Sequence, residues 1–135
     1  MAEVTKVQPV SYSSLTPPQS ATINGLVAGE TIATGDACYI RASDGAVMKA
    51  TGAANTAPAD VAGFAFGPAT VGEAITLVTE GNFRYGSALT ISAKYYLSGT
   101  VAGGLADAAS TGGLVPIAVA IDATRIRIVP AGLFQ

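Results

Sequence analysis

The chain has 135 residues, of which half are apolar and only 12% are charged, with 7 Lys and Arg against 9 Asp and Glu and a net charge of −2. This length suits one ordinary hydrophobic core. Because the basic residues are few and scattered, the composition argues against nucleic-acid binding. So few charges solvate a free surface poorly, which favours a protein that works against another protein surface.

The residue types needed for most catalytic sites are missing. There is no histidine, the commonest general base and metal ligand, and a single cysteine excludes an internal disulfide and a cysteine-based metal cluster. We therefore expect no enzyme activity, no cofactor and no metal. The longest apolar stretch, residues 114–121, is far short of a membrane span, and the first residues lack the apolar segment of a signal peptide. We expect synthesis in a cytoplasm and no membrane partner.

Residues 1–28 differ in composition from the rest and are predicted to form an extended N-terminal arm, followed by a single β domain over residues 29–135. Residues 8–20 contain three prolines and four serines, which favour extended backbone. The arm either docks on a neighbouring surface or is a disordered tail. We favour docking because a solvated tail carries more charge. The arm residues expected at such an interface are Val7, Val10, Tyr12, Leu15, Pro17 and Pro18.

From residue 29 onward, short β-prone runs alternate with Gly, Pro, Asn and Asp. Runs of this length and spacing predict an all-β domain, either a small β-barrel or a β-sandwich. The predicted strands cover residues 37–41, 47–50, 61–66, 74–79, 83–85, 94–97, 115–121 and 125–129. Only the alanine-rich residues 105–110 are compatible with a single helical turn.

Three of these runs return in the same order later in the chain, which predicts an internal pseudo-repeat built from a duplicated strand set. The matched runs are 37–40 with 94–97, 61–65 with 116–120, and 75–78 with 126–129.

Alternation within the third pair of runs predicts which side chains point inward. Apolar and polar residues alternate there, so Ile75, Leu77, Ile126 and Ile128 are expected in the core. Arg125 and Arg127 then point together to the other face. With Arg84 and Tyr85 they are expected to anchor a protein contact, because Arg and Tyr are enriched at interfaces.

Other polar groups have simpler structural explanations. The carboxylates of Asp36, Asp44, Asp107 and Asp122 lie in predicted turns, where they cap backbone N–H groups. Cys38 lies in a predicted strand and is expected to be a small buried apolar group. The aromatic residues are compatible with a sugar-stacking platform, but packing or subunit contact is the better explanation. These residues are Tyr39, Phe83, Tyr85, Tyr95 and Tyr96.

Taken together, the runs 29–30, 35–40, 44–45, 61–65, 72–77, 85–90, 95–98 and 103–105 resemble the small head decoration, or cement, proteins of tailed bacteriophages. The resemblance extends from Leu26 to Pro130 and rests on the order and spacing of turn and strand motifs.

This resemblance implies an all-β, oligomeric virion protein that binds the outside of the phage head and stabilises the shell. Its partner would be the major capsid protein of the same phage, and no catalytic residues carry over. A homo-oligomer is expected, with a trimer favoured over a dimer because three-fold symmetry can match that of a shell. The alternative is a head-fibre or tail-associated module that binds a receptor or glycan.

Overall fold

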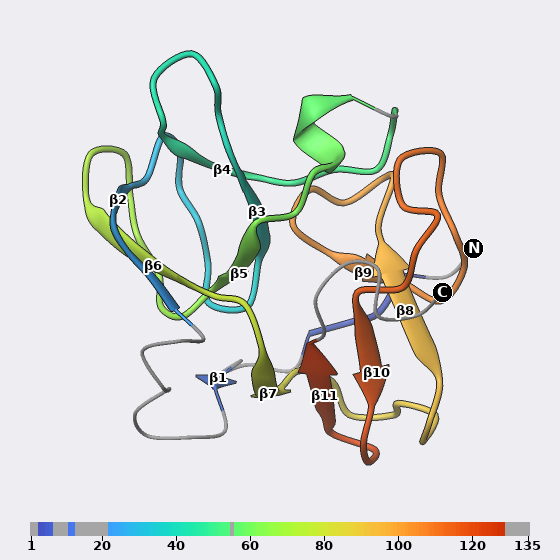
Figure 1. The fold of residues 1–135 in the computed structure, drawn as a ribbon. Coiled ribbons are helices and arrows are strands. Elements are labelled where there is room, and N and C mark those ends of the chain that lie inside the picture. The colour runs from blue at the N-terminus through green and yellow to red at the C-terminus, as the bar shows by residue number, and fades with distance from the viewer. Residues whose placement is uncertain (1–2, 7–10, 13–21, 55, 129–135) are drawn as a thin grey trace.

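The protein is an all-β fold, as the sequence predicts. The computed structural model describes residues 3–6, 11–12, 22–54 and 56–128. Within them the strands form two antiparallel sheets, which lie side by side in Figure 1. One turn of 3-10 helix, η2 (Ala57–Ala59), follows the first four strands and has a proline in its first turn.

The first sheet has five strands in the order β2-β6-β5-β3-β4. Their bounds are β2 Thr22–Val27, β3 Ala37–Ile40, β4 Val47–Lys49, β5 Gly63–Ala65 and β6 Ala74–Val78. The second sheet has six strands in the order β1-β7-β11-β10-β8-β9. Their bounds are β1 Ser11–Tyr12, β7 Gly81–Arg84, β8 Lys94–Leu97, β9 Leu105–Ala106, β10 Ala118–Ala120 and β11 Arg125–Ile128.

All eight predicted strands are present, and three further strands were not predicted. β2 lies inside the segment predicted as an arm, so the folded body begins before residue 29. The sequence does not indicate this strand, because Asn24-Gly25 resembles a turn. In the structure Asn24 and Gly25 form an irregularity in the β2–β6 register between Ile23 and Leu26, with Gly25 at φ +80°. β1 and β9 have two residues each, too few to show a period. β9 also replaces the helical turn considered for residues 105–110.

The internal repeat is visible in the pairing of the strands. The order β6-β5-β3-β4 in the first sheet matches β11-β10-β8-β9 in the second. Registers match as well, since Cys38 pairs with Gly63 where Tyr95 pairs with Ala118.

One detail of the predicted alignment is wrong. The sequence match aligns Leu77 of the first copy with Ile128 of the second copy. In the ladders, however, Ala65 pairs with Leu77 and its counterpart Ala120 pairs with Ile126. Leu77 therefore corresponds to Ile126, a slide of two residues. A slide by an even number keeps every side chain on its original face of the sheet, so both alignments preserve the apolar pattern.

The turn before the first matched strand also recurs. Gly35 donates from its backbone N–H to the carbonyl oxygen of Ala65 at 2.8 Å, and Ser92 donates in the same way to Ala120 at 2.8 Å. Both residues have a positive φ, of +84° and +70°. Ser92 is the one residue other than glycine with a positive φ among the described residues.

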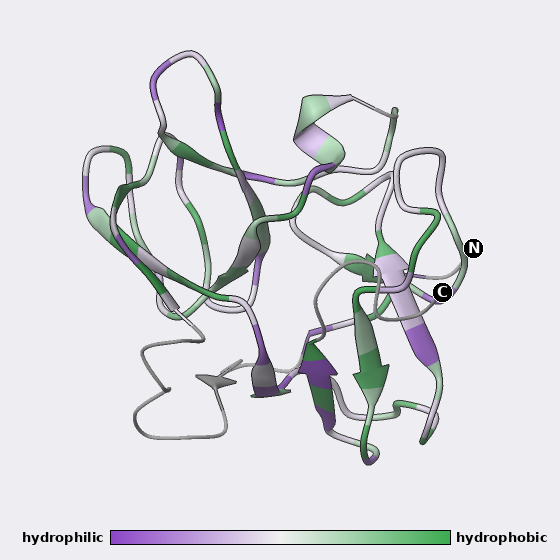
Figure 2. Ribbon diagram, viewed as in Figure 1, coloured by the Kyte–Doolittle hydropathy of each residue, from purple (hydrophilic) through white to green (hydrophobic). Residues whose placement is uncertain are grey.

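The predicted core residues are buried. Ile75, Leu77, Ile126 and Ile128 are at most 5% exposed, whereas Arg125 and Arg127 are exposed, and Figure 2 shows the alternation as green and purple bands along β11. A cluster of apolar side chains joins the two sheets. Within it the rings of Phe64 and Phe83 lie 6.2 Å apart between centroids.

The N-terminal residues lie along the folded body. Glu3 forms a bridge with Ala106, and the N–H of Val4 donates to the carbonyl oxygen of Leu105 at 3.0 Å. At the opposite edge of the same sheet, β1 pairs with β7. Residues of this N-terminal segment therefore pair with β9 on one side of the sheet and with β7 on the other. Both strands would otherwise present unpaired backbone groups.

Candidate partner-binding face

Three arginines predicted at an interface gather on the outer face of the six-stranded sheet. Arg84 of β7 lies directly opposite Arg125 of β11, and Arg127 follows two residues later on the same side. All three side chains are exposed. Their neighbours Phe83, Ile126 and Ile128 point into the core, and this alternation fixes the arginines outward.

A fourth cation extends this face across the sheet. Val119 of β10 pairs with Arg127 on one side and with Lys94 of β8 on the other, so the three side chains form one row. Four of the seven Lys and Arg residues of the chain thus lie on one sheet. Hereafter "the basic face" means Arg84, Lys94, Arg125 and Arg127. The sequence itself indicates the outward position of Lys94, because Lys94 and Tyr96 alternate with the buried residues Tyr95 and Leu97.

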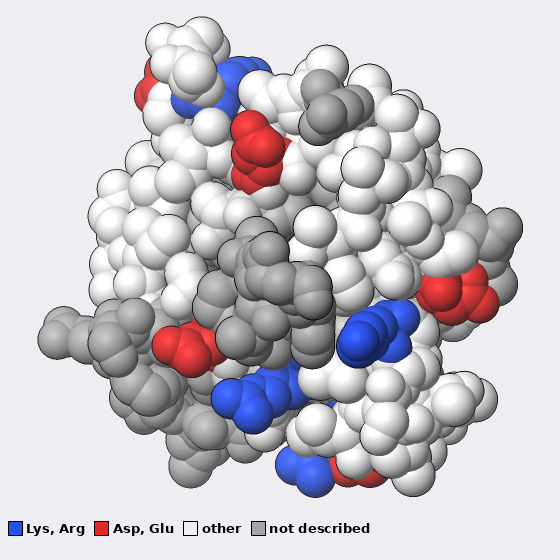
Figure 3. Space-filling view, turned by 45° about the vertical axis from the view of Figure 1, so that its right-hand side comes forward, with Lys and Arg blue, Asp and Glu red and all other residues white. Residues whose placement is uncertain are grey.

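Acidic groups neutralise this face only in part. Asp122 accepts from Nε of Arg125 at 2.7 Å and from the backbone N–H groups of Thr124 and Arg125. The Arg125 hydrogen bond is the main reason that the pKa of Asp122 is lowered. Arg84 and Arg127 have no ion-pair partner among the described residues. Figure 3 shows blue Lys and Arg groups in the lower half of the turned view, with red Asp and Glu groups beside them.

Tyr85, the fourth residue predicted at this interface beside the arginines, points the other way. It is fully buried, and burial raises the pKa of its hydroxyl. Nζ of Lys6 lies 5.7 Å from its ring centroid, and the hydroxyl has no hydrogen-bond partner within the described structure. Tyr85 follows β7 directly, and alternation places it with Phe83 on the inner side. Its assignment to the interface is therefore wrong.

The arm residues predicted at an interface fall mostly where the structure gives no description. Val7, Val10, Leu15, Pro17 and Pro18 lie outside the described residues, and for Tyr12 only the backbone is described. That backbone pairs with Phe83 of β7, so Tyr12 belongs to the edge strand next to the basic face.

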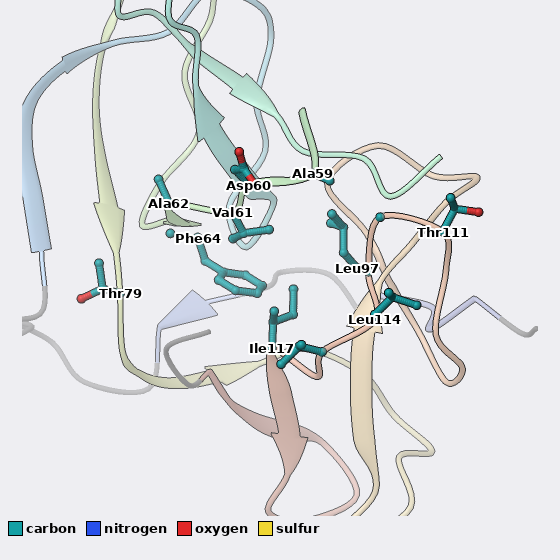
Figure 4. Close-up of a pocket in the computed structure, with 14 residues that line it drawn as sticks. Ala59, Asp60, Val61, Ala62, Phe64, Thr79, Leu97, Thr111, Leu114 and Ile117 are labelled. Carbon is teal, nitrogen blue, oxygen red and sulfur yellow. The ribbon is translucent and has the colours of Figure 1, made fainter. Parts of the chain in front are cut away.

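The second feature of the surface is an apolar cavity of about 590 Å³ at the seam between the two sheets. Figure 4 shows Phe64 of β5 and Leu97 of β8 facing it from different sheets, with Ile117 between them. Thr79 lines the same cavity beyond the end of β6. Leu114 also lines the cavity, and its side chain is 69% exposed.

The predicted turn carboxylates serve the backbone. Asp36 accepts from the N–H of Ala33, and Asp44 from that of Ala46. Asp122 does the same, so three of the four turn predictions are confirmed. The turn prediction for Asp107 stays a prediction.

Cys38 and the acidic side chains are the remaining groups that could react or bind a metal. Cys38 is fully buried, and burial is the first reason that the pKa of its thiol is raised to about 12. Among the described residues, no three His, Cys, Asp or Glu side chains gather as metal ligands would. No helix within that part of the chain is long and apolar enough to cross a membrane.

Comparison of the sequence with family models and with curated proteins finds no match to either.

Proposed function

We propose that this protein is an accessory capsid protein, a decoration or cement protein of a tailed phage. In this proposal its basic face binds an acidic region of the major capsid protein on the outside of the assembled head. The proposal combines the resemblance of the chain to head decoration proteins with the composition and the surface of the fold.

One observation carries the choice of the basic face. Like charges directly opposite each other on neighbouring strands destabilise a sheet, yet Arg84 faces Arg125 in a protein with only 16 charged residues. Asp122 offsets part of this cost at Arg125, whereas Arg84 has no ion-pair partner among the described residues, and an anionic partner that lies against the pair offsets the remainder. Arginine also suits such a contact because its guanidinium group binds carboxylates in a bidentate manner.

Self-association belongs to the same proposal. A homo-oligomer, a trimer before a dimer, would bind a symmetric shell through several weak contacts at once. Exposed apolar side chains are available for contacts between copies, among them Val71 and Ile91, which are 69% and 65% exposed.

The glycan-binding alternative gains no support from the aromatic residues. Tyr85 and Tyr95 are buried. Tyr39 and Tyr96 are half-buried and belong to different sheets. The tyrosines that were considered as a stacking platform therefore do not form one exposed surface, and we do not propose this function.

The test is co-sedimentation of the purified protein with empty heads of the phage that encodes it. We expect saturable binding by a defined oligomer, weaker binding at higher salt, and a large loss of binding in the Arg84→Glu/Arg127→Glu double variant.

Arg41→Glu/Lys49→Glu is the matched control, because it changes the net charge equally but alters the five-stranded sheet. Wild-type protein that ignores the heads would sink the proposed function. Equal losses in the two double variants would leave a role in shell binding but remove the basic face from it.

A further inference from the structure

We propose that the contact made by the basic face has an apolar centre, at Val119 and Ile121, and that it receives an extended segment of the capsid protein in which an apolar side chain lies between two acidic ones. This inference rests on the proposed function and adds to it the chemistry of the partner segment.

The first argument is the row of side chains across the middle of the second sheet. Val119 of β10 pairs with Arg127 of β11 on one side and with Lys94 of β8 on the other. Side chains of directly paired residues lie on the same face of a sheet. Arg127 and Lys94 are exposed and Val119 is half-buried, so one apolar side chain lies between two cations on the outer face.

A second apolar side chain extends this centre along β10. Ile121 directly follows the strand, and its N–H donates to the carbonyl oxygen of Arg125 at 3.1 Å, which continues the pairing with β11. Alternation then places Ile121 on the same face as Val119. Its side chain is 36% exposed. An apolar centre with a charged rim is the usual composition of a protein interface.

The second argument comes from the repeat. The counterpart of this row in the first sheet is Ala37, Phe64 and Val78, which pair in the same order. All three are at most 3% exposed and belong to the apolar cluster that joins the two sheets. In the first repeat the second sheet therefore covers this row. The described residues form no third sheet to cover the same row of the second repeat, so that row is where a segment of another molecule fits.

Charge identifies the occupant. In a two-fold contact between copies, the same face would meet itself. The exposed arginines of one copy would then lie against those of the other, and like charges opposite each other are destabilising. A segment that carries carboxylates avoids this repulsion and pairs with the arginines instead.

The spacing of the row gives the pattern of the segment. Adjacent strands lie about 4.8 Å apart, so the backbones at Arg127 and Lys94 are separated by about 10 Å. In an extended segment that crosses the strands, residues four apart are separated by about 13 Å, and the residue midway between them points to the same side. Long side chains span the difference. Two carboxylates at this spacing reach the two cations while the side chain between them contacts Val119.

The test removes the apolar centre without a change of charge. Val119→Thr/Ile121→Thr keeps β-branched side chains, which suit strands. We expect its binding to empty heads to weaken several-fold, with the salt dependence of wild type, because the ionic contacts remain. The matched control is Val27→Thr/Val101→Thr, whose valines are 47% and 48% exposed but lie in β2 and in the loop between β8 and β9. The control should bind as wild type does.

The possible failures separate this inference from the proposed function. Unchanged binding in Val119→Thr/Ile121→Thr, or an equal loss in the control, would overturn the apolar centre, while a loss in Arg84→Glu/Arg127→Glu would leave the proposed function standing. Wild-type protein that ignores the heads would overturn both. A changed oligomeric state in sedimentation velocity, with head binding per oligomer unaltered, would show that the face joins two copies instead.

Photo-cross-linking tests the partner segment directly. With p-benzoylphenylalanine in place of Ile121, irradiation of decorated heads should link this chain to one peptide of the major capsid protein. In that peptide we expect an apolar residue with Asp or Glu two residues before it and two residues after it. Digestion and mass spectrometry locate the link. A link to a second copy of this chain, a link to a segment without acidic residues, or no link would contradict the proposal.

Discussion

Gly35 and Ser92 occupy equivalent turns of the two repeats, yet only one of them suits the backbone there. In each turn the third residue has a positive φ and the fourth donates its N–H to the first, at 3.1 Å from Asp36 to Ala33 and at 3.0 Å from Ala93 to Thr90. A residue with a Cβ atom loses about 1–2 kcal/mol in this conformation. The second repeat therefore carries local strain that the first avoids.

Replacing Ser92 by glycine should relieve that strain. The gain is reduced by the greater freedom of glycine in the unfolded chain, so we expect Ser92→Gly to stabilise the protein by up to about 1 kcal/mol. Urea unfolding measures the change. Ser92→Ala retains Cβ and should give no such gain; an equal gain from alanine would show that the hydroxyl, not the backbone, is responsible.

Asp44 supplies a pH dependence of known sign. The guanidinium of Arg41 and the N–H of Ala46 lower its pKa from 3.8 to about 2. Because the folded state holds this proton less tightly than the unfolded state, the contribution to stability is present above pH 4 and is lost as the pH falls towards 2. The group is exposed, so the effect is small. Urea midpoints between pH 5 and 2 should fall less steeply in Asp44→Asn than in wild type.

At the scale of strands, the repeat explains why so much of the fold follows from sequence. Alternation in β6 and β11 identifies their buried faces, and the matched runs place the same ladder order in both sheets. The same reasoning brings Arg84, Arg125 and Arg127 to one face once β7 is paired with β11. The sequence of a single strand does not determine which strand it pairs with, however, because its partners lie far away in the chain.

Alternation over so short a run also explains why the sequence misplaces Tyr85 and does not single out Lys94. Tyr85 is one residue beyond the end of β7, and the sequence alone groups it with its exposed neighbour Arg84. Lys94 joins the arginines only through the pairing of strands, which places Val119 between Lys94 and Arg127. The cavity had no sequence signal, since its walls come from both sheets and meet only in three dimensions.

The pair Arg84 and Arg125 allows a test in which stability and binding change in opposite directions. Arg84→Glu places a carboxylate opposite Arg125, and we expect the free energy of unfolding to rise by about 0.2–1 kcal/mol. Binding to heads should fall in the same variant. Urea unfolding and co-sedimentation measure the two quantities. Loss of both stability and binding would indicate instead that Arg84 supports the fold.

At the scale of the whole molecule, the N-terminal segment ties the two repeats together. Lys6 forms an ion pair with Asp36, whose carboxylate is nearly buried beside β3. The Nζ atom of Lys6 also lies over the ring of Tyr85, which follows β7 of the other sheet. Glu3 accepts a hydrogen bond from the hydroxyl of Ser98, which is also buried. The segment predicted as an arm therefore contributes at least these residues to the stability of the domain.

Removing the Lys6 cation should expose that contribution. Lys6→Met leaves the buried carboxylate of Asp36 without its counter-ion, and we expect a loss of about 1–3 kcal/mol in the free energy of unfolding. The double variant Lys6→Met/Asp36→Asn should recover part of the loss, because the buried charge is gone as well. Chemical denaturation of wild type and the two variants measures both effects. An unaltered midpoint in Lys6→Met would show that the ion pair of Lys6 with Asp36 does not stabilise the fold.

The bridge between Glu3 and Ala106 has a consequence for the order of events during synthesis. Glu3 leaves the ribosome well before Ala106, so it has no bridge partner until the six-stranded sheet is being made. Until then the five-stranded sheet can assemble from residues 22–78 alone, whereas the six-stranded sheet waits for β11 near the C-terminal end. Closing contacts so distant in sequence is slow. The bridge of Glu3 to Ala106 therefore forms late in folding and completes an edge of the six-stranded sheet.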